Sequence, residues 1–287
     1  MNTTDAELPY AVVFGTIMSI GFPLNAIAIW ILLRHHSLKS PNVIFMLNLA
    51  IADLLLASSL PLKVYFLTTG VWPLGYTACI GVRVLFRVNI GTSSIFITFI
   101  SVDRVLAVVY PLRSRLIRTA CNAVKAVILA WLLLIIIAIH RYIQFEDLKC
   151  HNKSTFFEYR RYEVNHRSDP LKIFQLVLVL VLLVVNVVST VLVFLTLRRN
   201  VKDLPKVNNR VNVMLLFVMS LIIFIICFLP MTISPFIKAR QTYLKCIAAT
   251  NCCLDPVLYY FSLDAFWKKK EESKPAQTRA MIRHQRH

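Results

Sequence analysis

The chain has 287 residues, of which 57% are hydrophobic and 16% are charged. This composition excludes an ordinary soluble domain, which is about one quarter charged. The net charge of +18 would indicate nucleic-acid binding only if the basic residues formed a patch on a soluble fold. They lie instead between long apolar runs, so no nucleic acid is expected as a partner.

Seven apolar stretches follow one another along the chain, each long enough to cross the roughly 30 Å hydrocarbon core of a bilayer as a helix. The polar residues 1–8 lack the basic region of a cleavable signal peptide. We therefore predict an all-α membrane protein, a seven-transmembrane helix bundle (10–261) with an N-terminal segment (1–9) and a tail (262–287). The predicted spans cover residues 10–33, 42–68, 79–110, 122–139, 171–197, 211–237 and 243–261.

Lysine and arginine gather in alternate connections, which predicts the orientation. The connections after the first, third and fifth spans and the tail are basic, whereas residues 1–9 and the loop around Trp72 carry no basic residue. The connection 140–170 mixes basic with acidic residues. We expect a multi-pass plasma-membrane protein with an extracellular N-terminus. The glycosylation sequons at Asn2 and Asn152 would then both face the glycosylating side.

Three basic residues lie in the outer halves of the second and third spans: Lys63, Arg83 and Arg87. Arg83 and Arg87 are four positions apart and share one helix face. Since arginine pairs bidentately with carboxylate and phosphate, an extracellular, small acidic ligand is expected. The alternative is that these cations balance the acids of the connection 140–170. Further basic residues near the same face are His140, Arg141, Lys238, Arg240 and Lys245.

Four polar residues from three spans lie near mid-depth: Asp53, Asn89, Ser93 and Asp255. If the helices form a bundle, these residues can converge on a hydrated pocket that holds a small cation with oxygen ligands. The alternative is a polar cluster that only joins helices.

The inner end of the third span carries Asp103 and Arg104. We expect a switch in which Arg104 pairs with Asp103 in one state and is released to a cytoplasmic partner in another. The alternative is an arginine that only reaches the lipid headgroups.

Prolines predict breaks in the sixth and seventh spans. Phe224, Cys227 and Phe228 lie within two turns of Pro230, and Pro256 follows the intramembrane Asp255. A kinked helix can swing at its ends, whereas the alternative for the aromatic group is simple core packing.

Several of these residues stand in a pattern that spans the whole chain. They are Asn25, the stretch 48–53 (NLAIAD), Pro61, Trp72, Asp103-Arg104-Val105, Trp131, 227–230 (CFLP) and 255–259 (DPVLY). Together they resemble a rhodopsin-like (class A) G-protein-coupled receptor. CFLP and DPVLY are similar to the branch that holds purinergic nucleotide, protease-activated, lysophospholipid and hydroxycarboxylic-acid receptors.

The resemblance implies activation of a heterotrimeric G protein, a disulfide between Cys79 and Cys150, and a sodium ion in the mid-depth pocket, with no other cofactor. It also implies a short amphipathic cytoplasmic helix after Tyr259, anchored in membrane lipid by Phe266. The expected ligand-binding residues are Lys63, Arg83, Phe86, Arg87 and Phe228. The expected switch residues are Asp103, Arg104, Phe224, Pro230, Pro256 and Tyr259.

The chain departs from the family pattern at the fifth span, where Val181 and Ser189 align with the usual proline and tyrosine. The stretch from Pro230 to Pro256 is also too short for two complete outer helix ends. We therefore expect Ser234-Pro235 to end the sixth helix early, with a connection of few residues, a more open pocket and weaker ligand capture.

Three other classes of function compete with this interpretation of the sequence. A receptor-like protein that signals weakly or not at all is one alternative. A transporter would show internal repeats or a chain of intramembrane acids and bases, and neither is visible. An enzyme is not expected, because no nucleophile–base or metal-ligand spacing occurs.

Overall fold

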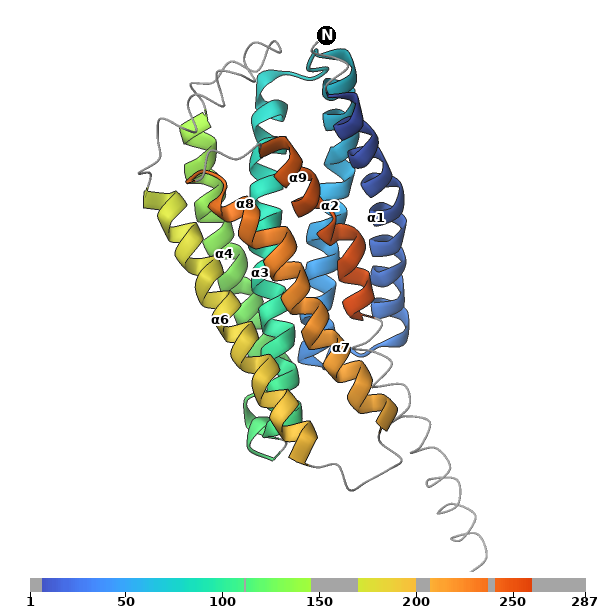
Figure 1. Ribbon diagram of the computed structural model, residues 1–287, viewed down its shortest axis with the longest axis vertical. Coiled ribbons are helices and arrows are strands. Elements are labelled where there is room, and N and C mark those ends of the chain that lie inside the picture. Colours follow the sequence, from blue (N-terminus) through green and yellow to red (C-terminus); the bar gives the residue numbers. More distant parts are fainter. Residues whose placement is uncertain (1–6, 111, 146–169, 200–206, 237–240, 260–287) are drawn as a thin grey trace, which may run out of the picture.

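The computed structural model describes residues 7–110, 112–145, 170–199, 207–236 and 241–259, which form a bundle of long helices (Figure 1). Six of the described helices are long and apolar enough to cross a membrane. The elements are α1 (Leu8–His35), α2 (Pro41–Thr69), α3 (Tyr76–Val109), the 3₁₀ turn η1 (Arg113–Leu116), α4 (Ala120–Phe145), α6 (Pro170–Arg199), α7 (Val207–Ile223), the π-helical turn η3 (Phe224–Phe228), α8 (Leu229–Ile233) and α9 (Gln241–Ala249).

The helix boundaries follow from the sequence. Pro41 begins α2, where its missing N–H costs nothing, and Gly70 ends that helix in the left-handed conformation, with φ of 76°. The first, second, third and fifth predicted spans agree with the helices to within three residues at each end, whereas α4 runs six residues beyond the predicted end at 139, and the sixth and seventh spans are interrupted.

Helix α3 lies at the centre of the bundle and contacts α2, α4, α6 and α7. Side-chain hydrogen bonds reinforce this packing. Asn186 Nδ2 of α6 donates to Thr98 Oγ1 of α3 at 2.8 Å, and Trp131 Nε1 of α4 donates to Asn48 Oδ1 of α2 at 3.0 Å. Such bonds stabilise membrane helix pairs because lipid offers no alternative partner.

The sixth span contains a π-helical turn directly before Pro230. The Leu229 N–H donates to the carbonyl of Phe224, so the hydrogen-bond ladder widens just before the residue that has no N–H to give. Helix α8 ends at Ile233, as expected from Ser234-Pro235, and α9 begins at Gln241. The early end of the sixth helix is therefore confirmed.

The seventh span is broken at Thr250, and helical residues resume over 251–259. We expected the break at Pro256, and that expectation is wrong. Pro256 cannot bond the carbonyl of Cys252, four residues earlier. Asn25 of α1 supplies the missing donor, with Nδ2 at 2.7 Å from that oxygen, and the helix continues through the proline.

Candidate ligand-binding and switch sites

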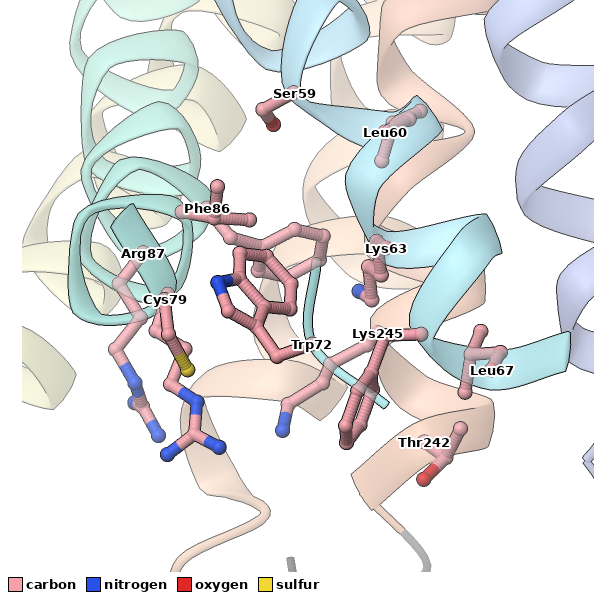
Figure 2. A pocket seen from close by; sticks show the side chains of 13 residues that line it. Ser59, Leu60, Lys63, Leu67, Trp72, Cys79, Phe86, Arg87, Thr242 and Lys245 are labelled. Carbon is pink, nitrogen blue, oxygen red and sulfur yellow. The ribbon is translucent and has the colours of Figure 1, made fainter. Parts of the chain in front are cut away.

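A pocket opens at the N-terminal end of the bundle, where α1 begins and α2 ends. Its walls come from α2, α3, α9 and the loop that carries Trp72. Figure 2 shows the Trp72 indole between Cys79 and Arg87 of α3 on one side and Lys63 and Lys245 on the other. Apolar side chains make up much of the wall: Leu60, Phe66, Leu67, Trp72, Val82 and Phe86.

Four basic residues line this pocket: Lys63, Arg83, Arg87 and Lys245. None of the lining residues that the structure describes is acidic. Walls of low dielectric focus the field of one sign of charge, so the pocket attracts anions. Of the five expected ligand-binding residues, Lys63, Arg83 and Arg87 are among these four cations, and Phe86 also lines the wall.

Lys63 is held by two aromatic rings. Its Nζ lies 3.7 Å from the ring centroid of Phe14 in α1 and 4.2 Å from that of Phe86 in α3. Cation–π contacts of this kind are worth roughly 0.5–2 kcal/mol. They fix the ammonium group in the pocket wall and tie α1, α2 and α3 together.

Phe228, the fifth expected ligand residue, lies elsewhere. It is fully buried and packs edge-to-face on Phe224, with ring centroids 5.3 Å apart. It does not line the pocket. The two rings belong to the π-helical turn of the sixth helix, so Phe228 packs beside Pro230, and its contact with a ligand stays a prediction.

The mid-depth polar residues do converge. Asp53 Oδ1 accepts a hydrogen bond from Asn89 Nδ2 at 3.1 Å and from Ser93 Oγ at 3.5 Å. Asn251 Nδ2 donates to Ser93 Oγ at 3.1 Å, and the Cys252 thiol approaches Asp53 Oδ1 at 3.7 Å. The cluster thus joins α2, α3 and the seventh helix.

The carboxyl groups of Asp53 and Asp255 interact with each other. No described N–H or hydroxyl group donates to Asp53 Oδ2, to either oxygen of Asp255 or to Asn89 Oδ1. Both aspartates are fully buried. Oxygen atoms without a donor fit a small hard cation such as sodium, and a buried carboxylate without a partner is costly.

At the opposite end of the bundle, Asp103 is bound by Arg118, which follows η1. Arg118 Nε donates to Oδ1 at 2.8 Å and Nη2 donates to Oδ2 at 2.9 Å. This bidentate ion pair reaches both carboxylate oxygens, and the expected pairing of Asp103 with Arg104 in one state of the receptor stays a prediction. Arg104 is itself buried, as are Phe224 and Tyr259, two of the other expected switch residues.

Some expected features lie outside the described residues: Asn2, Cys150, Asn152, Lys238, Arg240 and the amphipathic helix in 262–287. Cys79 is disulfide-bonded. Its pairing with Cys150 stays a prediction. Peptide mapping of surface-expressed protein without reduction should recover the linked peptides, and a free Cys150 thiol would contradict it.

Sequence reasoning missed Phe14, Arg118, Asn251 and Cys252. Asn251 could have been found, since it precedes Asp255 by four positions and so shares its helix face. Phe14 and Arg118 gave no signal, because an apolar residue in a span and a basic residue in a basic loop are both ordinary.

The helices of this bundle make the chain a multi-pass membrane protein. Residues 24–259 match the family described as 7 transmembrane receptor (rhodopsin family). The chain therefore belongs to the rhodopsin-like family of G-protein-coupled receptors, a family of receptors and not of enzymes.

Three receptors are similar to this chain over most of its length. The chain is 30% identical to lysophosphatidic acid receptor 4 of Homo sapiens, with 89% of this chain and 75% of that protein covered. It is 31% identical to lysophosphatidic acid receptor 5 of Bos taurus, over 90% and 76%. It is 30% identical to proteinase-activated receptor 1 of Xenopus laevis, over 88% and 62%.

Proposed function

We propose that this chain is a plasma-membrane receptor that binds an acidic lysophospholipid at its extracellular face and activates a heterotrimeric G protein. The observation that carries the proposal is the set of four cations in a largely apolar pocket, Lys63, Arg83, Arg87 and Lys245. The N-terminal end of the bundle is then the extracellular end.

The two kinds of lining residue suit the two parts of a lysophospholipid. Guanidinium and ammonium groups bind phosphate oxygens through charge-assisted hydrogen bonds. Leu60, Leu67 and Phe86 offer apolar surface to the start of a single acyl chain. The similarity to two lysophosphatidic acid receptors supports this class of ligand.

Signalling is proposed to depend on the other two sites. A sodium ion held by Asp53, Asn89, Ser93 and Asp255 would favour the inactive state. Arg104 would engage the G protein once the inner end of α3 becomes accessible to it. A ligand that favours the active state must then weaken sodium binding, because the coupling is reciprocal.

The proposal is tested by a screen of GTP exchange in membranes of cells that express the full chain. Nucleotides, lysophospholipids and small carboxylic acids are added separately, with membranes of untransfected cells as the control. We expect exchange to rise with an acidic lysophospholipid. A response to a nucleotide or a small carboxylic acid, with none to lysophospholipids, would contradict the ligand class.

A further inference from the structure

Trp72 brings an uncharged hydrogen-bond donor to the wall of the N-terminal pocket. Its indole N–H is buried, and no described residue accepts a hydrogen bond from it. An indole nitrogen can only donate, and a buried donor without an acceptor is costly. Because most buried polar groups in proteins have a partner, this one calls for an acceptor from outside the described chain.

The indole ring is held in place by its neighbours. Phe66 of α2 meets it edge-to-face, with ring centroids 6.0 Å apart, and the ring packs on an apolar cluster of α3 around Ile80. The side chains that flank it in Figure 2, Arg87 and Lys245, are long and have many rotamers. The N–H therefore keeps its place, and small movements of its flexible neighbours can uncover it for a bound ligand.

The pocket lining does not satisfy this donor. Its four basic side chains can only donate. The described hydroxyl groups of the lining belong to Ser59 and Thr242, and neither bonds to the indole. The acceptor is then expected on the ligand.

The position of the indole indicates which part of the ligand it meets. It lies between the basic side chains in Figure 2, which suit a phosphate group, and it contacts Phe66 of the apolar wall, which suits an acyl chain. In a lysophospholipid, the ester of the acyl chain lies between these two parts, and its carbonyl oxygen is an uncharged acceptor. An uncharged donor at this boundary matches that oxygen, whereas the cations match the phosphate.

We propose that Trp72 is a specificity-determining residue of the ligand site, whose indole N–H donates a hydrogen bond to the ester carbonyl of an acyl lysophospholipid. The inference rests on the proposed function and deepens it, because it names the linkage that the pocket prefers, an acyl ester over an alkyl ether. The ether has a methylene group in place of the carbonyl and would leave the buried N–H without an acceptor. A site built to bond a polar group discriminates against the analogue that lacks it.

The test compares two lipids that differ only in this linkage, oleoyl lysophosphatidic acid and its oleyl ether analogue. GTP exchange is measured on membranes that contain the full chain. The wild-type receptor should respond to the ester with a potency about threefold to tenfold higher, the usual effect of one uncharged hydrogen bond. Trp72 is then replaced by benzothienylalanine, in which sulfur takes the place of the N–H in a ring of nearly the same shape. The potency of the ester should fall to that of the ether, and the potency of the ether should change little.

Two further variants separate the hydrogen bond from the packing of the ring. Trp72→Phe removes the N–H together with ring area, so it should lower both potencies and still bring them together. It also keeps the ratio measurable if the benzothienylalanine receptor does not reach the surface. The matched control places benzothienylalanine at Trp131, whose N–H already has an acceptor in Asn48 Oδ1 at 3.0 Å and which does not line the pocket. That variant should keep the wild-type ratio.

The two proposals fail in different ways. If the wild-type receptor responds to neither lipid, the proposed function is wrong and the inference falls with it. If it responds to both lipids but does not prefer the ester, recognition of the carbonyl alone is overturned. The same holds if the variants at Trp72 leave the ratio of potencies as in the wild type, since the indole then supports only the fold of the pocket.

Discussion

The N-terminal pocket and the mid-depth cluster are built on the same three helices and carry opposite charge. Lys63, Arg83 and Arg87 face an open pocket, whereas Asp53 and Asp255 are sealed in the bundle. In each region α2 and α3 supply charged or polar groups, and the seventh helix completes the set. One helical frame thus places positive groups suited to an anion at its end and buried carboxylates suited to a cation at its centre.

The two regions are also close along α3. Arg87 lines the pocket and Asn89, two residues later, donates to Asp53 in the cluster. A shift of α3 that brings Arg87 toward a phosphate therefore also moves Asn89 relative to Asp53. This gives a short physical route for the proposed coupling between ligand and sodium, since both ligands would bias the position of one helix.

The largest effect on agonist potency is expected when a positive charge is removed from the pocket alone. Arg87→Ala should lower agonist potency by well over tenfold, because losing a buried charge-assisted contact costs on the order of 2–5 kcal/mol. Arg87→Lys should lose less, since it keeps the charge but not the bidentate geometry. Concentration–response curves are compared at equal surface expression. Unchanged potency in Arg87→Ala would remove the pocket from ligand binding.

The cluster is tested by changing the cation. Replacing a bulky organic cation with sodium at constant ionic strength should lower agonist affinity by about fivefold or more, within the usual range of coupling energies. Asp53→Asn should abolish this dependence while leaving the pocket residues intact. An agonist affinity that does not respond to sodium in the wild-type receptor would count against the site.

A change at the inner end of α3 should have a smaller effect on agonist-driven GTP exchange. The positive charge of Arg118 on Asp103 weakens the attraction of that carboxylate for Arg104. Arg118→Ala should therefore strengthen the Asp103–Arg104 pair and lower agonist-driven GTP exchange, by roughly fivefold at most for a partly exposed ion pair. Arg118→Lys should restore part of the activity. A rise in exchange in Arg118→Ala would show that the Arg118 pair restrains the receptor instead.

The hydrogen bond between Trp131 and Asn48 lies outside both regions, and its loss should affect the receptor least. Trp131→Phe removes the hydrogen bond to Asn48 but keeps most of the aromatic volume, so the free energy of unfolding should fall by about 0.6 kcal/mol. The thermal midpoint of the detergent-solubilised receptor measures this change. Agonist potency and sodium dependence should stay as in the wild type, and a large loss of either would contradict the separation of these sites from the α2–α4 contact.

Charges in apolar spans made much of this arrangement predictable. Arg83, Arg87 and Asp53 are conspicuous because ionisable residues at membrane depth are costly and need a purpose. Hydropathy alone placed the spans.

Other features depended on tertiary contacts that a sequence pattern does not contain. Pro256 predicts a break, but Asn25 of another helix supplies the donor that the broken ladder needs. Asp103 has an arginine directly beside it in the chain, but the connection after α3 brings Arg118 to both of its oxygens. In both places a contact from a distant part of the sequence contributes to the local structure.

The most direct measurement of the central claim removes the phosphate and nothing else. GTP exchange is compared for oleoyl lysophosphatidic acid and for monooleoylglycerol, which has the same acyl chain and glycerol but no anionic group. We predict a saturable response to the phosphate-bearing lipid that Arg87→Ala weakens, and no response to monooleoylglycerol. Equal responses of the wild-type receptor to the two lipids would contradict anion recognition by the basic pocket.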